Sequence, residues 1–166
     1  SGLCTWTPTE SQSTATVTVI ASDGTLSDSE EITITVNEVN VSPVLSPIGN
    51  KSVDELTQLS FTAIATDSDI PVDTLSFSLT GAPAGASING TTGEFTWTPT
   101  ESQSTTTVTI VTSDGTLTDS EEITITVNEV NVAPISISQS ITTNEDTAKL
   151  FTLNVTDADV PAQSLT

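Results

Sequence analysis

Side chains that carry oxygen ligands gather at a few places along this sequence. Asp67-Ser68-Asp69 recurs as Asp157-Ala158-Asp159, and Glu55 and Glu145 each lie twelve residues before one of these runs. The other acids and amides in repeated positions are Glu10, Glu38, Asn40, Glu101, Glu129 and Asn131. Ca²⁺ takes six to eight oxygen ligands from carboxylates, amides and carbonyls. The pattern indicates Ca²⁺ binding at domain junctions; the alternative is that these acids only solvate turns.

The composition limits the other chemistry that the chain can perform. Histidine is absent, so the many serine and threonine hydroxyls have no imidazole base to activate them as nucleophiles. A glycosidase needs two carboxylates that face each other across a cleft, and nothing in the sequence predicts a cleft. The single cysteine, Cys4, aligns with Phe95 in the repeat described below, and we expect it to be a small buried residue. The sequence therefore predicts a protein that is not an enzyme.

The charge excludes several classes of partner. The chain has 22 acidic residues and two lysines, which gives a net charge of −20. Such a surface repels the phosphates of nucleic acids and the headgroups of anionic membranes. No stretch approaches the ~18 consecutive apolar residues of a membrane span, so direct membrane insertion is not expected.

Two tryptophans offer a different possibility, the binding of carbohydrate. Trp6 and Trp97 stand in the same Thr-Trp-Thr-Pro-Thr context, and exposed indole rings could stack on sugars. Trp97 lies two residues after Phe95, however, so both side chains point to the same face of a strand. Packing in a hydrophobic core is therefore the expected role of the tryptophan.

Internal repetition decides the fold and the domain organisation. The segment Thr5–Pro43 returns almost unchanged at Thr96–Pro134, so Trp97 lies 91 residues after Trp6. Residues 61–71 and 151–161 repeat with a spacing of 90, because one residue is lost between Pro134 and Glu145. A unit of about 91 residues is a usual size for a β-sandwich domain.

This spacing predicts three parts of the chain. Residues 43–132 form one complete repeat, residues 1–42 the C-terminal half of a repeat, and residues 133–166 the N-terminal half of a further one. Neither half can bury a core alone. Two interpretations stay open: the chain is an excised part of a longer array, or the two halves complete each other between neighbouring copies.

Short alternating runs in the complete repeat predict seven strands and no helix. Ile123, Ile125 and Val127 share one face of the last run, which is typical of an antiparallel sheet with one solvated face. The expected strands are Val44–Ile48 continuing near Ser52–Asp54, Leu59–Thr66, Leu75–Thr80, Ala86–Ile88, Glu94–Thr98, Thr106–Thr112 and Glu122–Asn128. The side chains expected in the core are Phe61, Phe77, Trp97, Val108, Ile110 and Ile125. We expect an all-β, Ig-like, seven-stranded antiparallel sandwich.

The whole chain resembles the cadherin family, specifically the cadherin-like and dystroglycan-type repeats of bacterial and archaeal cell-surface proteins. The resemblance rests on the Asp-x-Asp of Thr66–Asp69, the segment Val53–Glu55, the turn Ser113–Gly115 and the Val-Asn-Glu-Val-Asn-Val-x-Pro linkers. It implies tandem cadherin-like sandwiches with Ca²⁺ bound between successive domains. The family linker carries a further Asp-Asn pair, which Val41 and Val132 replace here in a linker one residue shorter. Fewer or weaker Ca²⁺ sites are therefore expected.

Carried over by position, the resemblance assigns a set of ligands to each junction. The set at the second junction is Glu55, Glu101, Glu129, Asn131, Asp157 and Asp159. The set at the first junction is Glu10, Glu38, Asn40, Asp67 and Asp69. The first set has no counterpart of Glu55, because that position lies before the first residue of the sequence.

The predicted function is structural: a repeat segment of an extracellular surface protein, fibre or filament, with domain junctions stiffened by Ca²⁺. An adhesin or a carbohydrate-binding module that contacts surface glycans is the alternative. The two copies are nearly identical over 39 residues, whereas a binding module would differ at one loop cluster. The expected partners are adjacent repeats or copies of the chain, joined head to tail. Sequons for N-glycosylation begin at Asn50, Asn89 and Asn154.

Overall fold

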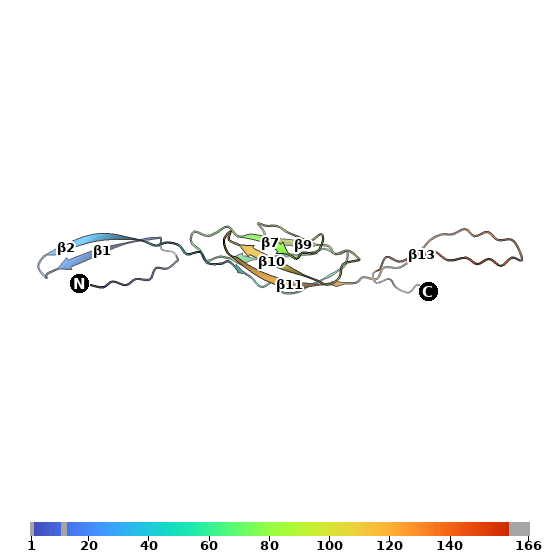
Figure 1. Cartoon of the computed structure of the whole chain (residues 1–166), viewed down its shortest axis with the longest axis horizontal. Helices are drawn as coiled ribbons and strands as arrows, with labels where there is room; N and C mark the ends of the chain where they lie inside the picture. The colour runs from blue at the N-terminus through green and yellow to red at the C-terminus, as the bar shows by residue number, and fades with distance from the viewer. Residues whose placement is uncertain (1, 11–12, 160–166) are drawn as a thin grey trace.

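The computed structural model of the chain describes residues 2–10 and 13–159 and shows an elongated molecule (Figure 1). A β-sandwich occupies the middle, a two-stranded hairpin extends from one end, and a segment with one short strand pair extends from the other. Every regular element of these residues is a β-strand, so the expected all-β fold is confirmed. The described residues contain no helix that is long and apolar enough to cross a membrane.

The sandwich contains all the strands predicted for the complete repeat. One sheet has the order β4-β11-β10-β7, and the other has the order β5-β9-β8 beside the short pair β3-β6. The strands are β3 Val44–Leu45, β4 Lys51–Asp54, β5 Leu59–Thr62, β6 Ala65–Thr66, β7 Ser76–Thr80, β8 Ser87–Ile88, β9 Glu94–Trp97, β10 Thr106–Ser113 and β11 Thr118–Asn128. The predicted runs 44–54 and 59–66 each divide into two strands.

The hydrophobic core lies between the two sheets. Alternate residues of β10 and β11 point inward, as the alternation of apolar residues in both strands requires. Trp97 is 1% exposed, and its Nε1–H donates to the carbonyl oxygen of Ala84 at 3.2 Å. The buried apolar side chains are Leu45, Val53, Ala63, Phe95, Trp97, Val108, Ile110, Ile123 and Ile125.

Two aromatic residues that were expected in the core are only partly buried. Phe61 stacks on Phe95 with ring centroids 4.7 Å apart, and the Nζ of Lys51 lies 5.4 Å from the centroid of the Phe61 ring. Phe77 lies on β7, which is an edge strand of its sheet. Both rings pack against the core from its margin, so the prediction of full burial is wrong in degree.

The first predicted strand crosses from one sheet to the other. Its beginning, β3, pairs antiparallel with β6, and its end, β4, pairs parallel with β11. Carboxylates of β11 hold the crossing: Asp119 accepts the N–H of Leu45 at 2.8 Å, and Glu121 accepts the N–H groups of Ile48 and Gly49 at 2.7 and 2.9 Å. The sandwich therefore contains one parallel strand pair, which the purely antiparallel expectation did not include.

The two end segments reproduce parts of the sandwich. In the hairpin, β1 Thr14–Ser22 pairs with β2 Ser27–Thr35 in the same register as β10 with β11, 91 residues later. In the segment after the sandwich, β12 Ile135–Ser136 pairs with β13 Val155–Thr156 as β3 pairs with β6. These two strand pairs therefore form in the same way in each copy, whereas the counterpart of β9, residues 3–6, forms no strand.

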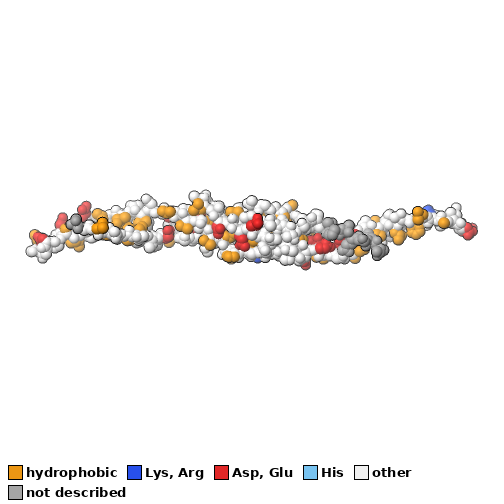
Figure 2. Space-filling view, turned by 60° about the horizontal axis from the view of Figure 1, so that its bottom comes forward, with side chains coloured by type: hydrophobic (Ala, Val, Ile, Leu, Met, Phe, Trp, Pro, Cys, Tyr) orange, Lys and Arg blue, Asp and Glu red, His pale blue; other side chains and the backbone are white. Residues whose placement is uncertain are grey.

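The apolar faces of these end segments are exposed to solvent. Val19 on β1 is 52% exposed, whereas its counterpart Ile110 on β10 is fully buried. Cys4 is also exposed, so the prediction that it is buried is wrong. Its counterpart Phe95 lies on β9, which pairs with β5 inside the sandwich, whereas residues 3–6 around Cys4 form no strand. Figure 2 shows hydrophobic side chains at the surface along both end segments.

Candidate metal centre

Three carboxylates meet where the hairpin joins the sandwich. Glu10 precedes β1, Glu38 follows β2, and Asp69 follows β6 of the sandwich. One carboxylate oxygen of each lies within 4.8 Å of the other two. Within residues 2–10 and 13–159, no other group of three or more acidic, histidine or cysteine side chains meets this spacing. We call these three residues the first-junction cluster.

The backbone holds Asp69 in a fixed position within this cluster. The N–H of Val41 donates to both oxygens of the Asp69 carboxylate, at 3.0 and 3.2 Å, and the N–H of Asp69 donates to Oδ1 of Asp67 at 2.9 Å. Asp69 is 2% exposed. The Oδ2 of Asp67 is buried without a hydrogen-bond partner in the described structure. Because a buried carboxylate oxygen normally has a partner, this atom is suited to a cation.

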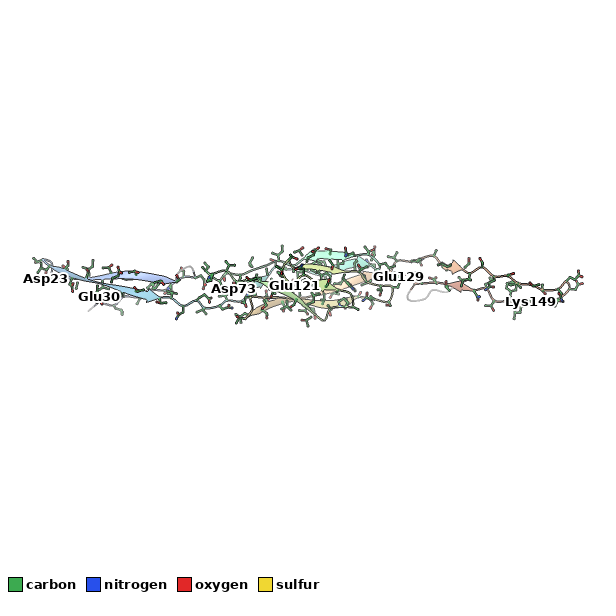
Figure 3. All side chains as sticks on the ribbon, turned by 90° about the horizontal axis from the view of Figure 1, so that it is seen from above. Asp23, Glu30, Asp73, Glu121, Glu129 and Lys149 are labelled. Atoms are coloured by element: carbon green, nitrogen blue, oxygen red, sulfur yellow. The ribbon has the colours of Figure 1, made fainter. Side chains whose placement is uncertain are left out.

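The electrostatics of the first junction are repulsive without a cation. Loss of hydration raises the pKa of Glu38, and nearby carboxylates raise it further; in order of effect they belong to Asp69, Glu10, Asp73 and Asp67. Asp73, at the hairpin end of the sandwich in Figure 3, is an acid that the sequence analysis missed. A count of acids in the loop after Thr66 would have found it, since that loop holds three aspartates within seven residues.

The predicted ligand Asn40 takes part in a different contact. Its Nδ2 donates to Oδ2 of Asp114 at 3.0 Å, in the turn between β10 and β11. The pKa of Asp114 is lowered by the N–H groups of Leu117 and Thr116 and by this amide. Asn40 therefore ties the linker to the sandwich through its amide nitrogen, and its amide oxygen is the atom that a cation could bind.

The second junction repeats this backbone geometry after the sandwich. The N–H of Val132 donates to both oxygens of Asp159 at 3.0 and 3.1 Å, and the N–H of Asp159 donates to Oδ1 of Asp157 at 3.1 Å. Asp159 is buried, as Asp69 is at the first junction. Glu55 is buried as well, and its Oε1 accepts the N–H of Val130 at 2.8 Å.

Repulsion between carboxylates also marks the second junction. Loss of hydration raises the pKa of Glu101, and the carboxylates of Glu55, Asp159 and Glu129 add to it. Loss of hydration, Glu55, Asp159 and Asp157 raise the pKa of Glu129 in the same way. The Oε2 of Glu101 is buried without a hydrogen-bond partner in the described residues. Five predicted carboxylates are thus neighbours here, at the end of the sandwich where Figure 3 labels Glu129.

Comparison with known proteins identifies the sandwich. A family model described as "Putative Ig domain" matches residues 42–128, which is more than half of the chain. The chain belongs to this family of Ig-like domains. Among curated proteins, none matches the sequence at a significant level.

Solved structures agree with an Ig-like, cadherin-like fold. Human CDH23 EC21-23 superposes on 89% of this chain with a TM-score of 0.57 and 19% sequence identity, and 55% of that chain is covered. Human Protocadherin-24 EC1-2, Form II, superposes on 73% of this chain with a TM-score of 0.52 and 26% identity, and 61% of that chain is covered. The Ig-like chain thus spans less than two thirds of the length of either protein.

The Ig-like fold leaves the remaining predicted positions at the surface. Asn131 is exposed in the linker between Glu129 and Val132. The three sequon asparagines are exposed, and two of them also shape the backbone: the Oδ1 of Asn50 accepts the N–H of Thr124 at 2.8 Å, and that of Asn89 accepts the N–H groups of Thr91 and Thr92 at 2.9 and 3.1 Å. The sequons Asn50, Asn89 and Asn154 stay predictions.

The buried Trp97 bears on the carbohydrate-binding alternative. One of the two indoles on which that alternative rested lies in the core of the Ig-like sandwich, as expected. Trp6, in the equivalent position of the hairpin, is 41% exposed. The local sequence of Trp6 matches that of Trp97, and carbohydrate binding through Trp6 stays a prediction.

Proposed function

We propose that this chain is a structural segment of an extracellular tandem-repeat protein, in which Ca²⁺ bound at the junctions holds successive Ig-like domains in line. Residues 43–132 are the complete repeat of this proposal, and residues 1–42 and 133–166 belong to the repeats on either side. The observation that carries it is the first-junction cluster, because Glu10 and Glu38 flank the hairpin whereas Asp69 follows β6 of the sandwich. A cation bound to all three ties the two parts together.

The donor set favours Ca²⁺ over other metal ions. The cluster offers carboxylates alone, whereas zinc and the softer transition metals prefer imidazole and thiolate. Mg²⁺ requires near-ideal octahedral geometry and keeps several waters, while Ca²⁺ accepts more oxygens in a flexible arrangement. Extracellular Ca²⁺ modules work at dissociation constants of about 10⁻⁴–10⁻³ M, a range that a linker with few oxygens can reach.

Ca²⁺ also removes the repulsion at each junction. Without a cation, loss of hydration and then several neighbouring carboxylates raise the pKa of Glu38, Glu101 and Glu129, so each junction holds like charges in close proximity. Bound Ca²⁺ neutralises part of this charge and replaces repulsion with shared coordination. Since Ca²⁺ binds the folded junction and not the unfolded chain, it raises the melting temperature by linkage.

Titration calorimetry with Ca²⁺ tests the proposal. We expect saturable binding at millimolar Ca²⁺ or below, and weaker binding in Glu38→Gln, which removes the charge of one cluster carboxylate without removing its bulk. Glu122→Gln is the matched control, because Glu122 is exposed on the outer face of β11, away from both junctions. Absence of binding heat at millimolar Ca²⁺, with a melting temperature unchanged by a chelator, would leave these acids as solvating groups only.

A further inference from the structure

The first and last segments of the sandwich lie side by side and run in the same direction. Residues 45–55 lead from the first junction toward the second, and so do residues 119–130, which contain most of β11 (Figure 1). Within these segments, β4 pairs parallel with the second half of β11. We call residues 45–55 together with residues 119–130 the terminal clamp.

Side chains extend this pairing toward the first junction. Before β4 begins, Asp119 and Glu121 of β11 accept three N–H groups of residues 45–49 at 2.7–2.9 Å. Next to the start of β4, the N–H of Thr124 donates to Oδ1 of Asn50 at 2.8 Å. The two segments are therefore already joined before their backbone ladder begins.

Further hydrogen bonds extend the pairing toward the second junction. The N–H of Glu55 donates to the carbonyl oxygen of Asn128 at 3.0 Å, and the N–H of Val130 donates to Oε1 of Glu55 at 2.8 Å. On the outer face, Nδ2 of Asn128 donates to Oγ of Ser52 at 3.1 Å and to Oδ1 of Asp54 at 3.0 Å. The clamp thus joins the start of the repeat to its end along most of β11.

Tension on the chain reaches the terminal clamp from opposite directions. The hairpin extends from one end of the sandwich, and residues 133–159 extend from the other (Figure 1). A pull from both sides draws residues 45–55 toward the first junction and residues 119–130 toward the second. Because the two segments run in the same direction, this pull slides one along the other. The evenly spaced bonds of a parallel pair are then loaded together instead of opening one by one.

We propose that the Ig-like repeat bears tension, and that the terminal clamp is the element that resists its unfolding when the chain is pulled from both sides. The inference rests on the proposed function only in that successive repeats are joined in series. It does not require Ca²⁺, because every bond of the clamp forms within one repeat. Forced unfolding is governed by the rate of unfolding, so the clamp acts by raising the barrier to unfolding.

The inner face of the clamp is buried. Leu45, Val53 and Glu55 of the first segment are 8%, 7% and 4% exposed. Hydrogen bonds beside a low-dielectric core are stronger than those in water. Sliding the first segment also removes Leu45 and Val53 from the core, which exposes apolar surface to water. Packing and hydrogen bonding therefore oppose the same movement.

The β11 side of the clamp recurs in the preceding repeat. All repeats in a series carry the same tension, so an array resists a pull only if each repeat has its own clamp. The counterparts of Asp119, Glu121 and Asn128 are Asp28, Glu30 and Asn37, 91 residues earlier. The repeat before the sandwich thus carries the same three β11 side chains that hold the first segment here.

Single-molecule force spectroscopy on the full chain, in chelator, tests the role of the clamp. In a Cys4→Ala background, handles at Thr35→Cys and Ser138→Cys, both exposed, pull the sandwich through its two linkers. In a second geometry Thr57→Cys replaces Thr35→Cys, so the load enters after β4 and bypasses residues 45–55. We expect the sandwich to unfold more slowly in the first geometry than in the second at the same force.

A pair of exposed-face variants supplies the second arm. In the first geometry, Asn128→Ala should speed unfolding by a factor of roughly 5 or more, because two hydrogen bonds of the clamp are lost from the barrier. In the second geometry it should have little effect. Thr96→Val is the matched control, since it removes only the hydroxyl contact with Ser87 between β8 and β9, at 3.1 Å, outside the clamp. Melting temperatures without force should be similar in the two variants.

The outcomes separate this inference from the proposed function. Equal unfolding rates in the two geometries, or equal effects of Asn128→Ala and Thr96→Val in the first geometry, would overturn the role of the clamp. Neither result bears on Ca²⁺ binding, which calorimetry measures. Conversely, absence of Ca²⁺ binding would refute the proposed function and leave the difference between the two geometries unchanged.

Discussion

The two tryptophans provide an internal test of the fold, because they share a local sequence but differ in burial. Trp97 is 1% exposed in the core and donates a hydrogen bond to the carbonyl oxygen of Ala84 at 3.2 Å. Trp6 is 41% exposed on the hairpin. The perturbation is replacement of each by alanine.

The expected magnitudes follow from this difference. A buried tryptophan replaced by alanine leaves a cavity that costs about 3–5 kcal/mol. The total stability of a domain of this size is about 5–15 kcal/mol, so Trp97→Ala removes a large fraction of it. At roughly 4–8 °C for each kcal/mol in a domain of 60–100 residues, the melting temperature of the sandwich should fall by more than about 12 °C. Trp6→Ala should change it by less than about 4 °C, since surface substitutions usually stay within ±0.5 kcal/mol.

Thermal and urea unfolding followed by circular dichroism measure both variants, at concentrations at which the chain is monomeric. A Trp97→Ala variant as stable as the wild type would show that Trp97 lies outside the core, and would revive stacking on sugars. Equal destabilisation by both substitutions would contradict the structural difference between the hairpin and the sandwich.

Three further predictions concern charged and polar groups. Glu121→Ala should lower the free energy of unfolding, measured in urea, by about 1.5–3 kcal/mol, because the N–H groups of Ile48 and Gly49 lose a charged acceptor. Glu122→Ala should lower it by less than about 0.5 kcal/mol. Thr112→Val should stabilise the sandwich by about 1 kcal/mol or more, because the Oγ1 of Thr112 is buried without a partner among the described residues; a loss of stability would reveal a bond to that hydroxyl. In chelator, acidification toward the ordinary glutamate pKa of 4.5 should raise the melting temperature of the wild type more than that of Glu38→Gln. Because the pKa of Glu38 is raised in the folded chain, the folded chain binds this proton at a higher pH than the unfolded chain. The stabilisation is therefore complete below the pKa of Glu38 in the unfolded chain and is lost as the pH rises through its pKa in the folded chain. An identical dependence of melting temperature on pH in the two proteins would contradict this prediction.

Most of the sandwich could be predicted because its signals are local. The alternation of Ile123, Ile125 and Val127 with threonines requires one apolar face, and turns such as Asp114-Gly115 mark where strands end. The 91-residue repeat added a constraint that a single strand lacks, because the same strand assignment had to fit the sequence of both copies. These signals gave the strands and four of the six expected core residues.

What the sequence did not predict depends on contacts between distant segments. The parallel pairing of β4 with β11 arises from the crossing held by Asp119 and Glu121, and no local pattern distinguishes these acids from Glu122 beside them. Cys4 was misjudged because its counterpart Phe95 lies on β9, which pairs with β5 in a sheet of the sandwich, whereas residues 3–6 around Cys4 form no strand.

The candidate site was predicted in part for the same reason. Repeat spacing and resemblance placed Glu10, Glu38 and Asp69 at one junction, and the structure brings their carboxylates together. The contact of Asn40 with Asp114 and the proximity of Asp73 to Glu38 required the three-dimensional arrangement of the linker and the loops. Charge alone could not separate these acids from those that only accept backbone hydrogen bonds.

The most direct test of the central claim, that Ca²⁺ stiffens the junction between domains, is a distance distribution across the first junction. Spin labels at Thr33→Cys and Thr107→Cys in a Cys4→Ala background sit on exposed positions of β2 and β10, and dilution with unlabelled chain limits the measurement to single copies. Pulsed electron–electron double resonance should give a broad distribution of distances between the two labels in chelator, and this distribution should narrow with millimolar Ca²⁺. In Glu38→Gln, the same narrowing should require more Ca²⁺. A distribution of the same width with and without Ca²⁺ would contradict the account.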